Sequence, residues 1–69
     1  MKEHVYKKIE ITGTSEVSSD DAIQNAIAKV SESVNHMDWF EVTEIRGMID
    51  NNKVHYWQVT VKIGFQVTN

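Results

Sequence analysis

The sequence DWFEVTEIRG, at residues 38–47, decides the fold of this chain. β-Branched and aromatic residues recur through the stretch and no stripe of helical period fits it, so we predict a β-strand. Side chains along a strand point alternately to its two faces. The first face then carries Trp39, Glu41, Thr43 and Ile45, and the second carries Phe40, Val42, Glu44 and Arg46. Phe40 and Val42 are expected in the core, whereas no neighbour along the strand covers the indole of Trp39.

The chain has 69 residues and is expected to form a single domain over residues 1–69. A domain of this size buries only about 60% of the surface that its unfolded chain exposes. Single cores below roughly 70–80 residues rarely supply more than about 3–5 kcal/mol, so such domains usually need disulfides, metals or association. The sequence contains no cysteine, which excludes disulfides and thiolate metal sites. We therefore expect the chain to associate with further copies of itself.

Charge and hydropathy argue against a nucleic acid or a membrane as the partner. The formal net charge is −3 and the sequence pI is about 5.4, whereas a non-specific nucleic-acid binder normally presents a basic face. The first residues lack the apolar segment of a signal peptide. No apolar run approaches the roughly 18 residues of a membrane span. The cytoplasm is the expected location.

Local signals at the start of the chain predict a strand followed by a helix. The strand covers residues 5–12 and is ended by Gly13. Ser18 is expected to cap the helix, with Asp21 in the place of a capping-box acid. An apolar stripe at spacings of three and four predicts about four turns, ending near Asn35. This stripe consists of Ala22, Ile23, Ala26, Ile27, Val30 and Val34.

The remainder of the chain predicts a long hairpin. Its strands cover residues 38–49 and 54–67, and the polar residues 50–53 form the turn because asparagine tolerates positive φ. The second of these strands has the clearest period-two pattern in the chain. Its odd positions are expected to pack on the helix, and they are Trp57, Val59, Val61, Ile63, Phe65 and Val67.

A turn centred between Asn51 and Asn52 pairs residues whose numbers sum to 103. A shift of this register by one residue would move every side chain to the opposite face, whereas a shift by two residues keeps the faces and stays open. The expected pairs are Glu41 with Lys62, Thr43 with Thr60, and Trp39 with Gly64. The first pair is favourable in charge. In the last pair, the missing side chain of Gly64 is expected to leave an open floor beside the indole, suited to a flat ligand.

These elements predict an α+β fold of order β-α-β-β, with a three-stranded antiparallel sheet packed on one helix. A parallel crossover is right-handed in nearly all known cases, and the simplest sheet places the third strand between the first and the second. One helix covers one face of such a sheet. The other face is expected to expose Tyr6, Trp39, Ile45 and Tyr56, and an apolar patch of this kind marks a contact with a partner or a ligand.

Four stretches, at residues 5–15, 21–26, 38–47 and 58–65, together resemble the dodecin family of small flavin-binding proteins. The matching segments include VYKKIE with GTS, then DAIQNA, DWFEVTEIRG and QVTVKIGF, and they span nearly the whole chain in the family's order. The resemblance implies a hollow shell of twelve subunits. It also implies that flavins of the FMN or riboflavin type bind in pairs at subunit interfaces.

The resemblance also implies roles for three residues. Each flavin ring is expected to stack on Trp39, with Gln58 at the polar ring edge and Arg46 near the phosphate. The family stores or scavenges flavin and quenches its excited state, and it is not regarded as enzymatic. Some members also bind coenzyme A. Two departures from the family pattern are Trp57, where tyrosine is frequent, and Gln66, where a basic residue is frequent, and the second puts a coenzyme A site in doubt.

The predicted register constrains how Gln58 could share a ligand with Trp39. It places Gln58 opposite Ile45, about six residues along the sheet from the indole. At about 3.3 Å per residue this distance is too long for one ring. The two residues are therefore expected to meet only across different subunits, so that the site exists only in the assembly.

Other interpretations of these residues stay open. Trp39 could be an interface residue in a ligand-free scaffold. It could instead belong to an aromatic sheet surface that binds single-stranded nucleic acid. Arg46 could be a solvated residue or form a salt bridge between subunits, and Trp57 is expected in the core. No histidine set has metal-ligand spacing, which argues against a metal site. No nucleophile has a recognisable base and orienting partner, which argues against an enzyme. A flavin spectrum of the purified protein would discriminate between these classes.

Overall fold

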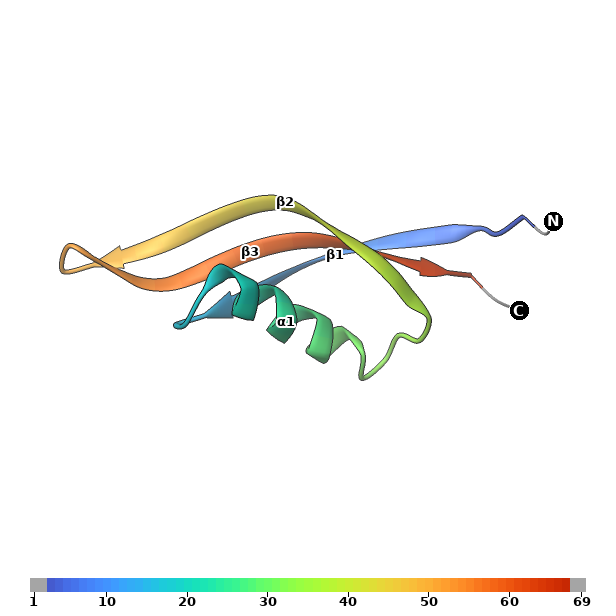
Figure 1. The fold of residues 1–69 in the computed structure, drawn as a ribbon, viewed down its shortest axis with the longest axis horizontal. Helices are drawn as coiled ribbons and strands as arrows, with labels where there is room; N and C mark the ends of the chain where they lie inside the picture. Colours follow the sequence, from blue (N-terminus) through green and yellow to red (C-terminus); the bar gives the residue numbers. More distant parts are fainter. Residues whose placement is uncertain (1–2, 68–69) are drawn as a thin grey trace.

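Three antiparallel strands form one sheet, and a single helix packs across one of its faces (Figure 1). The structure is a computed structural model and describes residues 3–67, so the ends of the domain expected over residues 1–69 lie outside the described residues. The sheet order is β1-β3-β2, with β3 in the centre, which confirms the predicted α+β fold. The elements are β1 (Tyr6–Ser15), α1 (Ser19–Val30), β2 (Met37–Asp50) and β3 (Lys53–Gln66).

The core lies between α1 and the central strand β3. Three aliphatic residues of β3 are fully buried, and they are at the odd positions expected to face the helix. Small side chains on the helix allow it to approach the sheet closely. The buried cluster consists of Val59, Val61 and Ile63 with Ala22, Ala26 and Val30. The odd residue Trp57 is only half-buried, so its predicted place in the core is wrong within one chain.

Gly13 lies inside β1, and its predicted role as the end of that strand is wrong. The strand continues to Ser15, and Gly13 is buried beneath the helix. A Cβ at this position would lie 2.1 Å from the carbonyl oxygen of Ala22 and 2.9 Å from the Cβ of Ala26. Glycine is therefore required here because the helix backbone rests directly on the strand.

The helix begins as predicted and ends earlier than predicted. The Ser18 hydroxyl accepts from the backbone N–H of Asp21 at 3.0 Å, which caps the first turn. The Asp21 carboxylate accepts from the Ser15 hydroxyl at 2.7 Å and so ties the helix start to β1. The helix ends at Val30, before the expected stop near Asn35. The chain then enters β2 through His36, which has a positive φ of 62°.

The turn between β2 and β3 forms where the sequence predicts it. Asn51 and Asn52 both have positive φ, at 54° and 64°, as a two-residue hairpin turn requires. The predicted register holds next to the turn, and it holds again where Trp39 pairs with Gly64 and Glu41 pairs with Lys62.

Between these two parts of the hairpin, bulges displace the register by one residue. Thr43 has no partner in the pairing, and Glu44 rather than Thr43 lies opposite Thr60. The Thr43 hydroxyl instead donates to the carbonyl oxygen of Thr60 at 3.2 Å. Because a bulge reverses the alternation of faces, the predicted faces of residues 44–46 are wrong. Arg46 lies on the same face as Trp39, and Ile45 lies on the face of the helix.

The helix leaves apolar residues of β2 uncovered, even though they lie on the same face of the sheet as the helix. It packs on β1 and β3, while β2 arches past it (Figure 1). Phe40 and Val42, which the sequence places in the core, are therefore 46% and 42% exposed in the single chain, and Ile45 is 56% exposed. Apolar side chains are thus exposed on both faces of the sheet, which favours burial against further copies.

We predict that the protein is an obligate oligomer, because association removes these apolar areas from water. Burial contributes about 25 cal/mol for each Å² of apolar surface. Sedimentation at micromolar concentration should show no species of subunit mass. A stable, folded monomer of 7.9 kDa would contradict this prediction and any site that needs two subunits.

Candidate functional site

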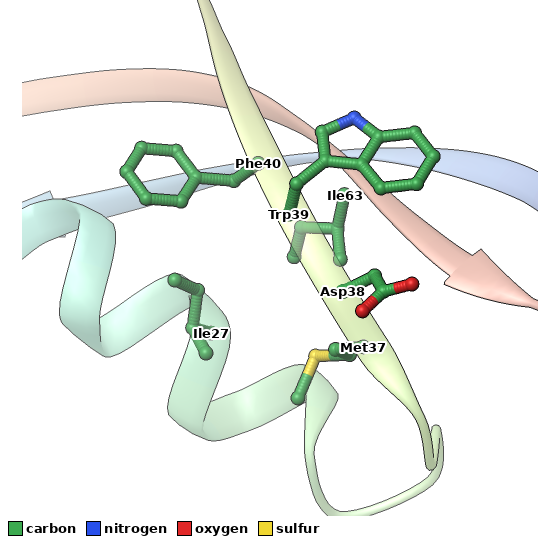
Figure 2. A pocket seen from close by; sticks show the side chains of 6 residues that line it. All are labelled: Ile27, Met37, Asp38, Trp39, Phe40 and Ile63. Atoms are coloured by element: carbon green, nitrogen blue, oxygen red, sulfur yellow. The ribbon is translucent and has the colours of Figure 1, made fainter.

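The indole of Trp39 lies flat on the backbone of β3 at Gly64. These two residues are paired across the strands. A Cβ at Gly64 would lie only 2.2 Å from Cζ2 and 2.3 Å from Cε2 of the indole. The prediction of open space over Gly64 beside the indole is therefore wrong, because the indole itself occupies this space. Figure 2 shows the indole on the opposite side of β2 from the ring of Phe40, so it lies on the face without the helix.

Tyr6 of β1 supports the indole from the far side of β3. The two ring centroids are 5.1 Å apart with an angle of 64° between the planes, which is an edge-to-face contact. Trp39 is nevertheless 39% exposed. One face of the indole therefore rests on the sheet, while the other face is open to a flat ligand or a neighbouring subunit.

A charged pair lies beside this aromatic group. The ammonium group of Lys8 on β1 binds the carboxylate of Glu41 on β2 across the central strand. The hydrogen bond from Lys8, together with its charge, lowers the pKa of Glu41 below the usual value for glutamate. Lys62, which the sequence analysis paired with Glu41, is opposite it in the register and contributes less to this shift.

Gln58 and Arg46 lie opposite one another near the other end of the same face. The register predicted from the sequence pairs Gln58 with Ile45, which is wrong because of the bulge at Thr43. Gln58 is half-buried, and the exposed guanidinium of Arg46 donates to the Glu44 carboxylate at 2.7 Å. The structure thus brings two of the three predicted site residues together on the sheet face that also carries Trp39.

The third predicted site residue lies far from this pair. Gln58 is six residues along β3 from Gly64, which corresponds to roughly 20 Å at about 3.3 Å per residue. A flavin ring is much shorter than this distance. Within one chain, Trp39 and Gln58 therefore cannot contact the same ring, as the sequence analysis expected.

A shallow hollow of about 240 Å³ lies on the helix side of β2 (Figure 2). Its lining is mostly apolar and joins the uncovered part of β2 to the helix. The lining residues are Ile27, Met37, Asp38, Trp39, Phe40 and Ile63. Among its lining residues, the Asp38 carboxylate is the one group suited to acid–base chemistry, and none is a nucleophile.

Residues 3–67 contain neither a metal-binding cluster nor a membrane-spanning helix. No three histidine or acidic side chains of this part of the chain gather into a group that could hold a metal ion. In the same residues, no helix is both long and apolar enough to cross a membrane. His4 and Gln66 are joined by a hydrogen bond of 2.6 Å between the His4 Nδ1 and the Gln66 amide.

We predict that Gly64→Ala displaces the indole of Trp39, because the added methyl group would overlap the ring. The experiment uses a Trp57→Phe background, in which Trp39 is the single tryptophan. Its emission should shift to longer wavelength as the ring leaves the sheet. Gly47→Ala is the control, since the nearest atoms to a Cβ there are 3.8 Å away. An unchanged spectrum in Gly64→Ala would show that the indole does not rest on this residue.

The sequence and the fold match known proteins over nearly their whole length. A curated dodecin from Thermus thermophilus is 48% identical over 63 residues, which cover 91% of each chain. A solved structure from the same organism superposes with a TM-score of 0.92 at 45% identity, covering 97% of this chain and 98% of the other. The dodecin of Streptomyces coelicolor gives a TM-score of 0.93 at 40% identity, covering 100% of this chain and 99% of the other.

Some solved structures of the Thermus thermophilus dodecin carry a single replacement of an arginine by alanine or of a tryptophan by phenylalanine. The family model described as Dodecin matches residues 5–68 of the present sequence. This match and the identity to the Thermus protein confirm the resemblance found in the sequence. The chain belongs to the dodecin family.

Proposed function

We propose that this protein binds, stores and sequesters a flavin of the FMN or riboflavin type, and quenches its excited state without catalysing a reaction. The observation that carries the proposal is the indole of Trp39, which lies flat over Gly64 with one face exposed. An indole in this position offers a stacking surface for a flat aromatic ligand. The indole would also be an electron donor at contact distance from the isoalloxazine ring of a stacked flavin.

The proposed site requires at least two subunits. The stacking surface at Trp39 and the polar pair of Gln58 and Arg46 lie on one sheet face, about six residues apart along β3. A flavin stacked on the indole of one subunit can contact Gln58 only from a neighbour. The exposed apolar areas of the sheet supply the driving force for association. We propose that the assembly is the homododecamer of the family.

Gln58 and Arg46 have complementary roles in this proposal. The Gln58 amide offers both a donor and an acceptor, which suits the alternating polar edge of an isoalloxazine ring. The Arg46 guanidinium can bind a phosphate through two parallel hydrogen bonds. Its present partner is the exposed Glu44 carboxylate. Exposed ion pairs of this kind contribute only about 0–1 kcal/mol, so an FMN phosphate can compete with Glu44 for the guanidinium.

We do not extend the proposal to coenzyme A. The family's frequent basic residue after Gly-Phe is replaced by Gln66, which carries no charge. Its amide is hydrogen-bonded to the His4 ring. A cofactor with several phosphate groups therefore lacks its expected cation at this position.

We predict that Trp39→Ala loses both the stacking surface and the electron donor. Stacking of a flat base on an aromatic side chain contributes about 1–3 kcal/mol, and we borrow this scale for the flavin. Affinity should fall roughly ten- to a hundredfold, since about 1.4 kcal/mol is a factor of ten. Any flavin still bound should fluoresce more strongly than in the parent. The measurement is flavin fluorescence during titration into each variant, after the parent has been shown to bind flavin by its absorption spectrum.

Trp39→Phe is the matched control for the two roles of the indole. A phenyl ring keeps much of the stacking surface but is far harder to oxidise, so binding should largely remain while quenching is lost. Assembly is checked by sedimentation for each variant. If Trp39→Ala assembles and quenches flavin as the parent does, Trp39 has only a structural role. A parent that assembles but binds no flavin would leave the ligand-free scaffold as the function.

We predict that Gln58→Ala weakens flavin binding and leaves assembly intact. Each hydrogen bond lost at the ring edge should cost about 0.5–1.5 kcal/mol, and more where a buried polar atom stays unpaired. Gln24→Ala is the control, because Gln24 is an exposed residue of α1. Equal flavin affinity in assembled Gln58→Ala and in the control would remove Gln58 from the site.

A further inference from the structure

The side chain of Trp39 extends across the sheet rather than standing upright on it. It leaves β2, lies over Gly64 of β3, and meets the ring of Tyr6 on β1. Tyr6 pairs with Gln66, two residues beyond Gly64 along β3. Tyr6 therefore contacts the indole from the third strand, at the far end of its path across the sheet.

The glycine backbone alone does not determine the orientation of the indole. A flat contact with Gly64 supports the ring from below, but it leaves rotation within the plane and departure to another rotamer open. An edge-to-face contact has a preferred distance and angle, and the observed 5.1 Å and 64° fall in the favourable range. Tyr6 therefore supplies a directional restraint that Gly64 lacks.

Tyr6 is itself held by neighbours. The ring of His4 lies 6.4 Å from that of Tyr6 at an angle of 65°, and His4 is hydrogen-bonded to Gln66 at 2.6 Å. The residue that departs from the family pattern, Gln66, is thus connected to Trp39 through two aromatic contacts. Within residues 3–67 the Tyr6 hydroxyl makes no hydrogen bond to a side chain, so its ring is the part that acts on the indole.

We propose that Tyr6 is a positioning residue that holds the Trp39 indole flat over Gly64 and so presents its outer face for stacking. The ligand in this inference is the flavin of the proposed function, on which it rests. An indole that is already fixed loses less conformational freedom when the ligand binds, and this preorganisation raises affinity. The position of the indole in the flavin-free protein is a separate property and can be measured without any ligand.

The first test measures the indole in the flavin-free, assembled protein. In the Trp57→Phe background, time-resolved fluorescence anisotropy reports the local motion of Trp39 alone. Tyr6→Ala should increase the amplitude of fast indole motion, whereas Tyr6→Phe should leave it at the parent level because the ring is kept. Tyr56→Ala is the matched control, since Tyr56 contacts His55 near the other end of β3. If Tyr6→Ala does not assemble, Tyr6→Leu replaces it and keeps an apolar side chain without the aromatic ring.

The second test measures flavin binding and quenching. An edge-to-face pair contributes about 0.5–1.5 kcal/mol, so flavin affinity in Tyr6→Ala should fall about two- to tenfold. Tyr6→Phe should restore the parent affinity. Unchanged indole motion in an assembled Tyr6→Ala or Tyr6→Leu protein would overturn the inference. Increased indole motion together with a parent that binds no flavin would support the positioning of Trp39 by Tyr6 and overturn the proposed function.

Discussion

The structure depends on a difference in length between one short helix and two long strands. A helix of 12 residues is about 18 Å long, whereas a strand of 14 residues extends about 46 Å. The helix therefore covers part of one sheet face, and it does so only because Gly13 allows direct contact between helix and strand. The remaining sheet surface is apolar in places, and no element within residues 3–67 covers it. The predicted association and the candidate site both depend on this uncovered surface.

The bulge at Thr43 determines what that surface can do. With strict alternation, Arg46 would lie on the helix side, away from Trp39. The extra residue reverses the alternation, so Arg46 and Gln58 form a cross-strand pair on the same face as the indole. Bulges reorient side chains in this way near functional sites. A local irregularity of the edge strand therefore gives one sheet face both a stacking surface and a polar pair.

The sequence predicts the regular features well because they have local causes. The alternation of β3, the Ser18 cap and the turn at Asn51 and Asn52 each follow from a few neighbouring residues, and the structure confirms all three. The bulge could not be predicted, because residues 38–47 mix polar and apolar side chains on both faces. The hydrophobic pattern is therefore compatible with either assignment of residues 44–46 to the two faces. The contacts of Gly13 and Gly64 could not be predicted either, since they depend on segments that the fold brings close. For the same reason, Lys8 was missed as the partner of Glu41.

The separation between Trp39 and Gln58 has a thermodynamic consequence for the proposed site. A ligand that contacts both residues binds the assembly and not the isolated chain. By mass action, anything that binds only the assembled state also stabilises it, and the stability of an obligate oligomer depends on its concentration. Flavin occupancy and assembly are then linked. Gly64 and Tyr6 differ from the other residues in this respect, because they orient the indole within one subunit. The stacking surface is thus a property of the folded chain, while the complete site that we propose requires the assembly.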